Sequence, residues 1–214
     1  MFLRRKSFRP FLARVAAAVM TSTLLFLAAT GPARAEPRQY VIDPEHFSIA
    51  IKVMHIGYAD MIGLFVEGEG AFTFDEESLA LSDLKVTIKT ASFTTGHQKR
   101  DDHVRSADFL NAKEFPEMTF VGTSSERTGD RTGKVHGDLT LRGVTKPLTL
   151  DIVWNKSGEY PFGGGVFGSK PYVIGINATG SLNRSDFGMT YAVDNGLVGD
   201  RVDLIFGLEA IRQD

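Results

Sequence analysis

Apolar and polar side chains alternate along most of this chain with a period of two residues. Such alternation places the apolar side chains on one face of a β-strand and the polar side chains on the other. A strand with one buried and one hydrated face is typical of an antiparallel sheet. We therefore predict an all-β protein. The alternating runs cover residues 47–53, 84–89, 135–142, 148–154, 174–182 and 201–210.

Turn-forming residues separate these runs, and one short segment is predicted to be helical. Residues 128–133 are polar, contain two glycines and predict a hairpin. Residues 95–105 are predicted to form the helix, with Thr95 and Gln98 as a capping box at its start. About eight strands and one short helix favour a closed or nearly closed up-and-down antiparallel barrel.

Closure of the barrel limits what it can hold. An eight-stranded barrel is just wide enough to fill itself with side chains or to hold one slender ligand. The inward-facing residues of the alternating runs are aliphatic and aromatic, so a ligand would be apolar. Alternation by itself does not distinguish a self-filled barrel from one with a cavity.

The first 35 residues have the pattern of a secretory signal peptide. Residues 4–6 are basic, residues 15–29 are apolar and uncharged, and residues 33–35 form a small-x-small cleavage site. The apolar stretch is about 15 residues long, shorter than the roughly 20 that span a bilayer. We expect cleavage after Ala35, leaving an exported protein of residues 36–214 without stable membrane insertion. Arg4 and Arg5 keep twin-arginine export open as the less favoured route.

Charge and cysteine content narrow the function classes. Residues 1–35 hold six of the 24 basic residues and no acidic one, which leaves 18 basic and 26 acidic residues, a formal net charge of −8. An acidic domain is a poor match for nucleic acid or for anionic lipid. The chain has no cysteine, which excludes disulfides, thiolate nucleophiles and cysteine-bound metals. The remaining length fits one domain.

Five segments of the chain carry recognisable motifs, at residues 40–55, 63–70, 91–120, 137–145 and 183–210. The most specific of them contains Ala91-Ser92-Phe93-Thr94-Thr95, Arg100-Asp101-Asp102-His103, Asp108-Phe109 and Phe115-Pro116. In this order the segments resemble the YceI-like family of exported bacterial proteins. Phe47, Ile51 and Asp102 stand where the family usually carries serine, an aromatic residue and a small residue.

The resemblance implies a lipocalin-like, extended eight-stranded antiparallel β-barrel in the periplasm. Its hydrophobic pore would hold a long-chain isoprenoid amphiphile, such as a polyprenyl phosphate or an isoprenoid quinone. This lipid would be a bound ligand, and no cofactor would be required. Burial contributes about 0.8 kcal/mol per CH₂ group, so even part of an isoprenoid tail would support tight binding. The family has no settled catalytic activity, and we expect a carrier rather than an enzyme.

Eleven residues are candidates for ligand contact within that barrel. The strand ending at His55 has inward-facing residues at every second position, and aromatic residues would supply rigid walls. The expected pore-lining residues are Ile49, Ile51, Val53, His55, Phe65, Phe109, Phe115 and Trp154. The expected contacts to the ligand head are Arg100, His103 and Arg184, because arginine suits a phosphate or a quinone carbonyl.

Each of these assignments has a structural alternative. The aromatic residues are the usual constituents of a core, and His55 fits a buried histidine bonded to a carboxylate or to a backbone carbonyl equally well. Arg100 and Arg184 each have an aspartate nearby, Asp101 and Asp186, which favours a salt-bridged clamp that fastens the helix over one barrel end.

Two other functions remain open from the sequence. One is an enzyme that acts on a lipid-like substrate, with His55 and Asp101 or Asp186 in acid–base roles. The other is a self-filled barrel that acts through its surface. No metal site is expected, since His97 and His103 are six residues apart and do not share a helix face. The chain length of the ligand and the formation of a homodimer are also left open.

Overall fold

In the computed structural model, residues 36–163 and 168–213 are described, and the predicted signal peptide lies outside them. The helical elements are α1 (Gln98–Arg105), η1 (Thr90–Ser92) and η2 (Arg184–Phe187). The strands in chain order are β1 (Arg38–His55), β2 (Ala59–Phe65), β3 (Gly68–Phe74), β4 (Leu81–Lys89), β5 (Phe93–Thr94), β6 (Glu117–Arg127), β7 (Thr132–Leu141), β8 (Val144–Glu159), β9 (Tyr172–Asn183) and β10 (Val198–Gln213).

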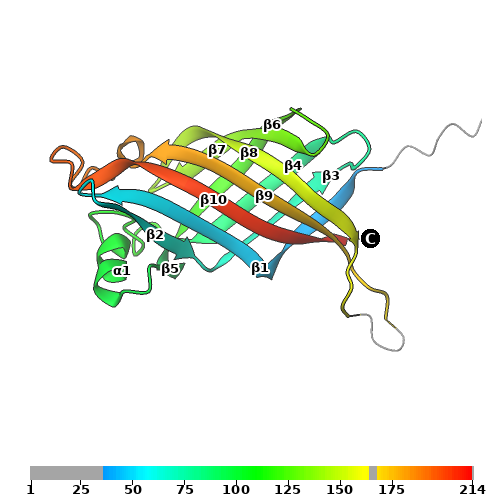
Figure 1. Cartoon of the computed structure of the whole chain (residues 1–214), viewed down its shortest axis with the longest axis horizontal. Helices are drawn as coiled ribbons and strands as arrows, with labels where there is room; N and C mark the ends of the chain where they lie inside the picture. The colour runs from blue at the N-terminus through cyan, green and yellow to red at the C-terminus, as the bar shows by residue number, and fades with distance from the viewer. Residues whose placement is uncertain (1–35, 164–167, 214) are drawn as a thin grey trace, which may run out of the picture. The chain divides into compact units, whose positions relative to one another are not determined.

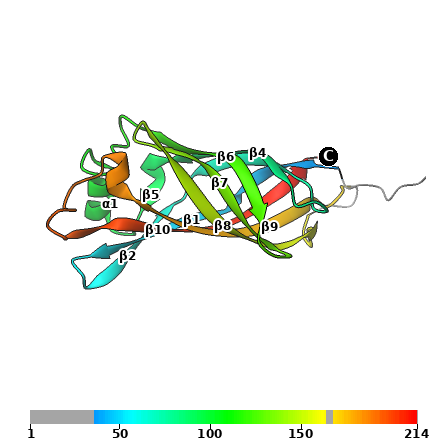
Figure 2. The same ribbon diagram turned by 90° about the horizontal axis from the view of Figure 1, so that it is seen from above.

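The sheet closes on itself, which confirms the predicted eight-stranded antiparallel barrel with one short helix. Neighbouring strands follow the order β10-β9-β8-β7-β6-β4-β3-β1, and β1 pairs again with β10. The seventh position, beside β1, is shared by two strands, because β3 pairs with residues 38–41 of β1 and β2 pairs with residues 49–55 of β1. Figure 1 shows the strands side by side, and Figure 2 shows them wrapping round the interior.

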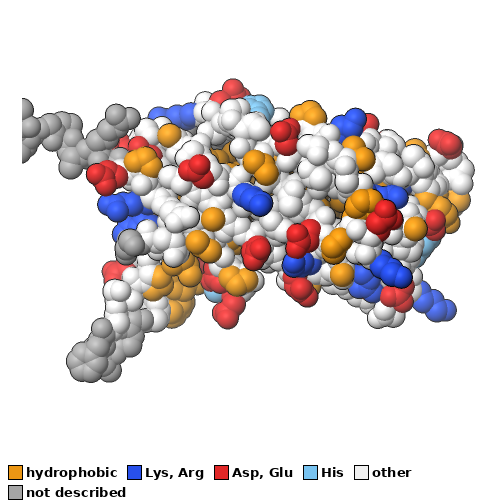
Figure 3. Space-filling view, turned by 180° about the vertical axis from the view of Figure 1, so that it is seen from behind, with side chains coloured by type: hydrophobic (Ala, Val, Ile, Leu, Met, Phe, Trp, Pro, Cys, Tyr) orange, Lys and Arg blue, Asp and Glu red, His pale blue; other side chains and the backbone are white. Residues whose placement is uncertain are grey.

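The alternation seen in the sequence separates the inside of the barrel from the outside. On β7, Val135, Leu139 and Leu141 are buried, while Asp138 between them is exposed. The outer surface accordingly carries acidic and basic side chains over much of its area (Figure 3). In β1 the register shifts between Ile42 and Phe47, and both residues remain buried. This bulge keeps two halves of one long strand facing the same core.

The short strand β5 packs closely against β2 and is thereby joined to the barrel. A Cβ atom on Gly63 would lie 2.3 Å from the ring carbon Cζ of Phe93, so no larger residue fits there without movement. Phe93 is buried and packs edge-on against Phe65, with ring centroids 5.1 Å apart. The glycine thus lets β5 lie against β2, and α1 follows directly from β5.

Candidate functional site: an apolar cavity with one polar end

The barrel encloses a cavity of about 500 Å³. This volume lies in the range of protein sites that bind small molecules. Most of its wall is aliphatic or aromatic, with contributions from each strand of the barrel. Representative residues along its length are Ile42, Phe72, Leu81, Ile88, Phe120, Leu148, Ile176 and Leu204. The interior is therefore hollow rather than filled by its own side chains.

Among the described residues that line the cavity, the polar side chains all lie at one end. They come from the end of β1, from the segment of β5 and α1, and from η2 and the loop after it, at the left in Figure 1. These residues are His55, Thr95, Arg100, His103, Arg184 and Tyr191. The cavity is thus amphipathic along its axis, with an apolar body and a polar mouth.

The opposite end of the barrel is closed by a hydrogen-bonded group. The carboxylate of Glu76 accepts bonds from the hydroxyls of Tyr40 (2.7 Å), Ser157 (2.5 Å) and Tyr172 (3.1 Å). Burial and the neighbouring Glu76 carboxylate raise the pKa of Tyr40, so its hydroxyl stays protonated and donates. These polar contacts were not predicted from the sequence, because the four residues lie on separate elements with no common motif.

Nine of the eleven candidate residues line the cavity. Phe115 and Trp154 do not, and their predicted positions need correction. Phe115 lies in the loop before β6, near Gly143 in the β7–β8 turn. Trp154 packs edge-on against Phe74 near the closed end, at a centroid distance of 5.7 Å. Trp154 does face the inside of the barrel, as predicted, but it lies nearer the closed end than the cavity does.

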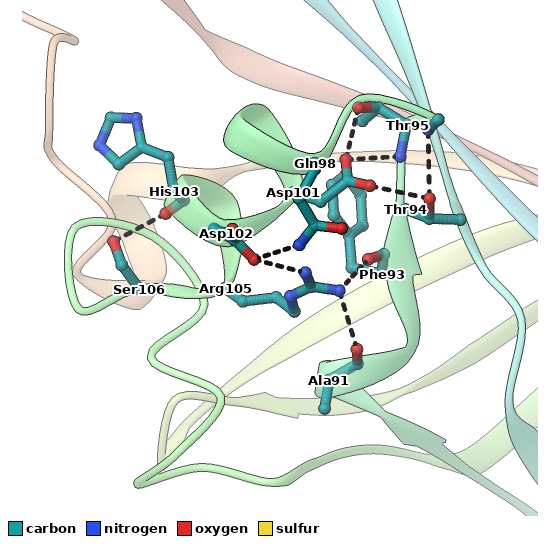
Figure 4. A network of polar contacts seen from close by, with 11 residues as sticks. Ala91, Phe93, Thr94, Thr95, Gln98, Asp101, Asp102, His103, Arg105 and Ser106 are labelled. Atoms are coloured by element: carbon teal, nitrogen blue, oxygen red, sulfur yellow. Dashed lines mark hydrogen bonds and ion pairs between the residues drawn. The ribbon is translucent and has the colours of Figure 1, made fainter.

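Helix α1 is attached to the barrel through Asp101, a buried carboxylate (Figure 4). Asp101 accepts hydrogen bonds from the backbone N–H of Thr95 (2.7 Å), from its hydroxyl (2.5 Å) and from the Thr94 hydroxyl (2.9 Å). The hydrogen bonds from Thr95 and Thr94 hold the pKa of Asp101 below its usual value, and they outweigh burial, which by itself would raise that pKa. The predicted capping box is wrong, because the helix begins at Gln98 and Thr95 bonds to Asp101 instead.

A second contact between α1 and the strand segment before it comes from the last turn of the helix. The guanidinium of Arg105 donates to the carbonyl of Phe93 at 3.1 Å and pairs with Asp102 at 2.8 Å (Figure 4). The side chain of Gln98 donates to the same Asp102 at 2.7 Å. The helix is thus held beside the polar mouth by Asp101 near its middle and by Arg105 in its last turn.

Arg184 joins three chain segments at the mouth. Its Nε donates to the carbonyl of Gly199 (2.8 Å), its Nη1 to Met189 (2.5 Å) and its Nη2 to Val198 (2.8 Å). The side chain is 3% exposed, and burial lowers its pKa from the usual value. Within the described residues it makes no ion pair with Asp186, so the predicted salt-bridged clamp is wrong in its partners. Backbone carbonyls take the place of carboxylates.

Arg100 and His103 are better placed than Arg184 to face a ligand. Nη1 of Arg100 contacts only the weak acceptor Sδ of Met61 (3.8 Å), while its Nε donates to Thr95 (2.8 Å). Nε2 of His103 lies 2.9 Å from a carboxylate oxygen of Asp108. The His103 ring also packs edge-on against Tyr191, with centroids 5.1 Å apart.

His55 lies at the exposed end of β1, beside the mouth. Among the described residues, no hydrogen bond or ion pair joins it to Asp101 or Asp186, the partners that the enzyme hypothesis requires. In residues 36–163 and 168–213, no group of three or more His, Asp or Glu side chains is arranged to hold a metal ion. No helix within those ranges is long and apolar enough to cross a membrane.

The fold and the cavity define a closed antiparallel β-barrel with an enclosed apolar interior, the architecture that lipocalins use for small apolar ligands. The chain belongs to the family of proteins with a YceI-like domain, whose model matches residues 40–210. The family resemblance inferred from the sequence motifs is therefore confirmed.

Individual relatives agree with this assignment. The chain is 38% identical to Protein YceI of Escherichia coli O157:H7 over 194 residues, which cover 90% of this chain and 94% of the relative. It resembles the crystal structure of a Campylobacter jejuni YceI protein with a TM-score of 0.66 and 31% identity, covering 75% of this chain and 90% of that one. A polyisoprenoid binding domain from Saccharophagus degradans shares the fold, with a TM-score of 0.56, 12% identity and coverage of 83% and 100%.

Proposed function

We propose that this protein binds a long-chain isoprenoid amphiphile, with the tail in the apolar body of the cavity and the head at the polar mouth. The observation that carries the proposal is the restriction of polar lining residues to one end of a cavity of about 500 Å³. The neighbour described as a polyisoprenoid binding domain supports the same ligand class. A polyprenyl phosphate and an isoprenoid quinone both combine such a tail with a polar head.

The energetics favour recognition of the tail. Ten buried CH₂ groups would contribute about 8 kcal/mol, from which the ordering of the tail and the loss of free motion subtract several kcal/mol. The protein would therefore select a ligand by the length and girth of its tail. Arg100 would contact the head. Its Nε and Nη2 donate to Thr95, whereas its Nη1 contacts only the thioether sulfur of Met61.

We further propose that the protein acts in the periplasm as a carrier or store and returns its ligand chemically unchanged. The signal-peptide pattern in residues 1–35 supports export. A water-insoluble amphiphile needs a protein cavity to cross an aqueous compartment. Enclosure of the tail would provide this without any catalytic step.

The proposal can be tested by blocking the cavity. Ala178 is buried and lines the cavity, so Ala178→Phe fills space with an apolar ring and introduces no charge. We expect retention of an isoprenoid quinone and of a polyprenyl phosphate with matched tail length to fall about tenfold or more, because the tail loses part of its volume. Ligand-loaded protein is extracted with solvent and the lipid is quantified by mass spectrometry.

A matched pair of charged variants tests which strand face contacts the tail. Ile51 and Val53 line the cavity, whereas Ile205 on the neighbouring strand is 50% exposed. The double change Ile51→Asp and Val53→Asp should abolish retention, and Ile205→Asp should leave it unchanged. Wild-type retention by both Ala178→Phe and the double variant would contradict the proposal.

A further inference from the structure

The mouth of the barrel is surrounded by exposed apolar side chains. We call Ile56, Tyr58, Tyr191 and Leu197 the mouth rim. They are 43%, 89%, 47% and 45% exposed, respectively. Three of them, Ile56, Tyr191 and Leu197, also line the cavity, so the rim is continuous with the proposed binding site. Hydrophobic side chains also reach the surface at this end in the view from behind, at the right of Figure 3.

Ile56 occupies a backbone position that disfavours it. The turn between β1 and β2 has positive φ at Ile56 (52°) and Gly57 (73°), and the N–H of Tyr58 bonds to the carbonyl of His55 at 3.0 Å. This is the pattern of a type I′ turn, which prefers Asn-Gly at its two central positions, within a three-residue connection between the paired residues His55 and Ala59. A β-branched residue with positive φ is strained, and such strain is found mainly where a side chain serves a function. The protein thus keeps an exposed isoleucine at the tip against the local conformational preference.

Two separate loops form the rim. The N–H of Ile56 donates to the carbonyl of Leu197 at 3.0 Å, which joins the β1–β2 hairpin to the loop before β10. Within that loop the N–H of Val198 bonds to the carbonyl of Ala192 at 3.1 Å. Tyr191 packs edge-on against Phe109, with ring centroids 5.4 Å apart. The apolar side chains are therefore held in place by hydrogen bonds and ring contacts.

Few charged residues lie on the segments that form the rim. Residues 54–59 contain no Asp, Glu, Lys or Arg, and the loop from Tyr191 to Leu197 contains one charged residue, the exposed Asp194. Behind the hairpin tip, the ammonium group of Lys52 lies 3.3 Å from carboxylates of both Asp60 and Asp203. An apolar tip with tyrosines, followed by a belt of charges, complements the boundary between lipid tails and headgroups. Because residues 36–214 carry a formal net charge of −8, attraction to anionic lipid would not supply the binding energy.

We propose that the mouth rim inserts into the surface of a lipid bilayer. The amphiphile would then pass between the bilayer and the cavity without crossing water. This transfer step rests on the proposed function, whereas docking of the rim depends only on the exposed side chains. The partner is a neutral lipid surface rather than a second copy of the chain or another protein.

The docking test uses the mature protein and vesicles of phosphatidylcholine at high salt, with co-sedimentation as the readout. Ile56→Asn places the preferred residue in the turn, so we expect an equal or higher melting temperature together with about tenfold weaker vesicle binding. The opposite responses of stability and binding separate docking from misfolding. Phe162→Ser is the control, because Phe162 is 72% exposed and lies in the β8–β9 connection, at the closed end.

A second measurement separates docking from ligand binding. Tyr58 does not line the cavity, so Tyr58→Ser should slow uptake of a fluorescent isoprenoid from vesicles but not from cyclodextrin. Failure of the wild-type protein to take up the probe from either source, with vesicle binding intact, would refute the proposed function but not docking. Uptake from cyclodextrin without any vesicle binding would refute docking but not the function. Equal loss of vesicle binding in Phe162→Ser, or a dimer that hides the rim in analytical ultracentrifugation, would also overturn docking.

Discussion

Arg184 shows how one side chain can fix the geometry of the mouth. Each of its three nitrogens donates to a different backbone carbonyl, and the side chain is almost completely buried. Arginine suits this role because its rigid guanidinium directs donors in several directions at once. The main role of Arg184 in the cavity wall is therefore structural. Arg100 is the better candidate for direct contact with the ligand head.

This role predicts the effect of replacing Arg184. Arg184→Met keeps much of the side-chain length but leaves three carbonyls without their donor, so we expect the free energy of unfolding to fall by about 3 kcal/mol. Urea denaturation measures the change. Arg201→Met is the control, because Arg201 is 69% exposed and pairs with Asp203 at the surface, where such pairs contribute under about 1 kcal/mol. Similar losses in the two variants would contradict the assignment.

At the residue level, the sequence predicted which side chains face inward better than what they bond to. Alternation is a direct consequence of strand geometry, so Ile49, Ile51 and Val53 were placed correctly. The partners of Arg184 and Asp101 were not predicted, because bonds to backbone carbonyls, and to threonines on the segment just before the helix, leave no recognisable pattern in the sequence.

The attachment of α1 to β5 is expected to depend on pH. The pKa of Asp101 is held down by hydrogen bonds from Thr95 and Thr94, so the carboxylate is more acidic in the folded protein than in the unfolded chain. A depressed pKa contributes stability above the unfolded value of about 3.9, and this contribution is lost as the pH falls through the folded pKa. Acid should therefore loosen α1 from β5.

Asp101→Asn tests this attachment. The amide cannot ionise, so we expect lower stability than wild type at pH 7 and a smaller decrease in stability as the pH is lowered from about 5 to about 2. Melting temperature against pH provides the comparison, and amide hydrogen exchange locates the change in α1. Parallel pH curves for the variant and the wild type would show that Asp101 does not carry the dependence.

Element boundaries were harder to predict than element type. Six of the strands followed from their two-residue period, whereas β2, β3 and β6 lie outside the alternating runs. The register shift in β1 between Ile42 and Phe47 was not predicted, although Asp43-Pro44 at that place is a turn signal. The start of α1 was misplaced because Thr95 and Gln98 matched a capping pattern whose hydrogen bonds are not formed. The capping box does not form because the buried carboxylate of Asp101 makes stronger hydrogen bonds with Thr95.

At the scale of the whole molecule, the central feature is a barrel that is hollow, closed at one end and polar at the other. Closure follows from pairing of β1 with β10, and the sequence predicted about eight strands. Whether the interior is filled depends on side-chain volumes summed over every strand, which a period of two does not reveal. The positions of Phe115 and Trp154 could not be predicted for a similar reason. The place of a loop and the position of a residue along the barrel axis depend on the tertiary structure.

The continuity of the cavity with the mouth rim suggests a single path for an amphiphile, from a lipid surface past Ile56 and Tyr191 into the apolar body. On this account the closed end around Glu76 limits how far a tail can enter.

The most direct test of the account is native mass spectrometry of the protein purified from its own periplasm, followed by solvent extraction and mass identification of the released molecule. We expect a single isoprenoid species, stoichiometric with the protein and chemically unchanged after uptake and release. A bare protein mass, with no uptake of an added polyprenyl phosphate or isoprenoid quinone, would contradict the proposal that the cavity binds such a lipid.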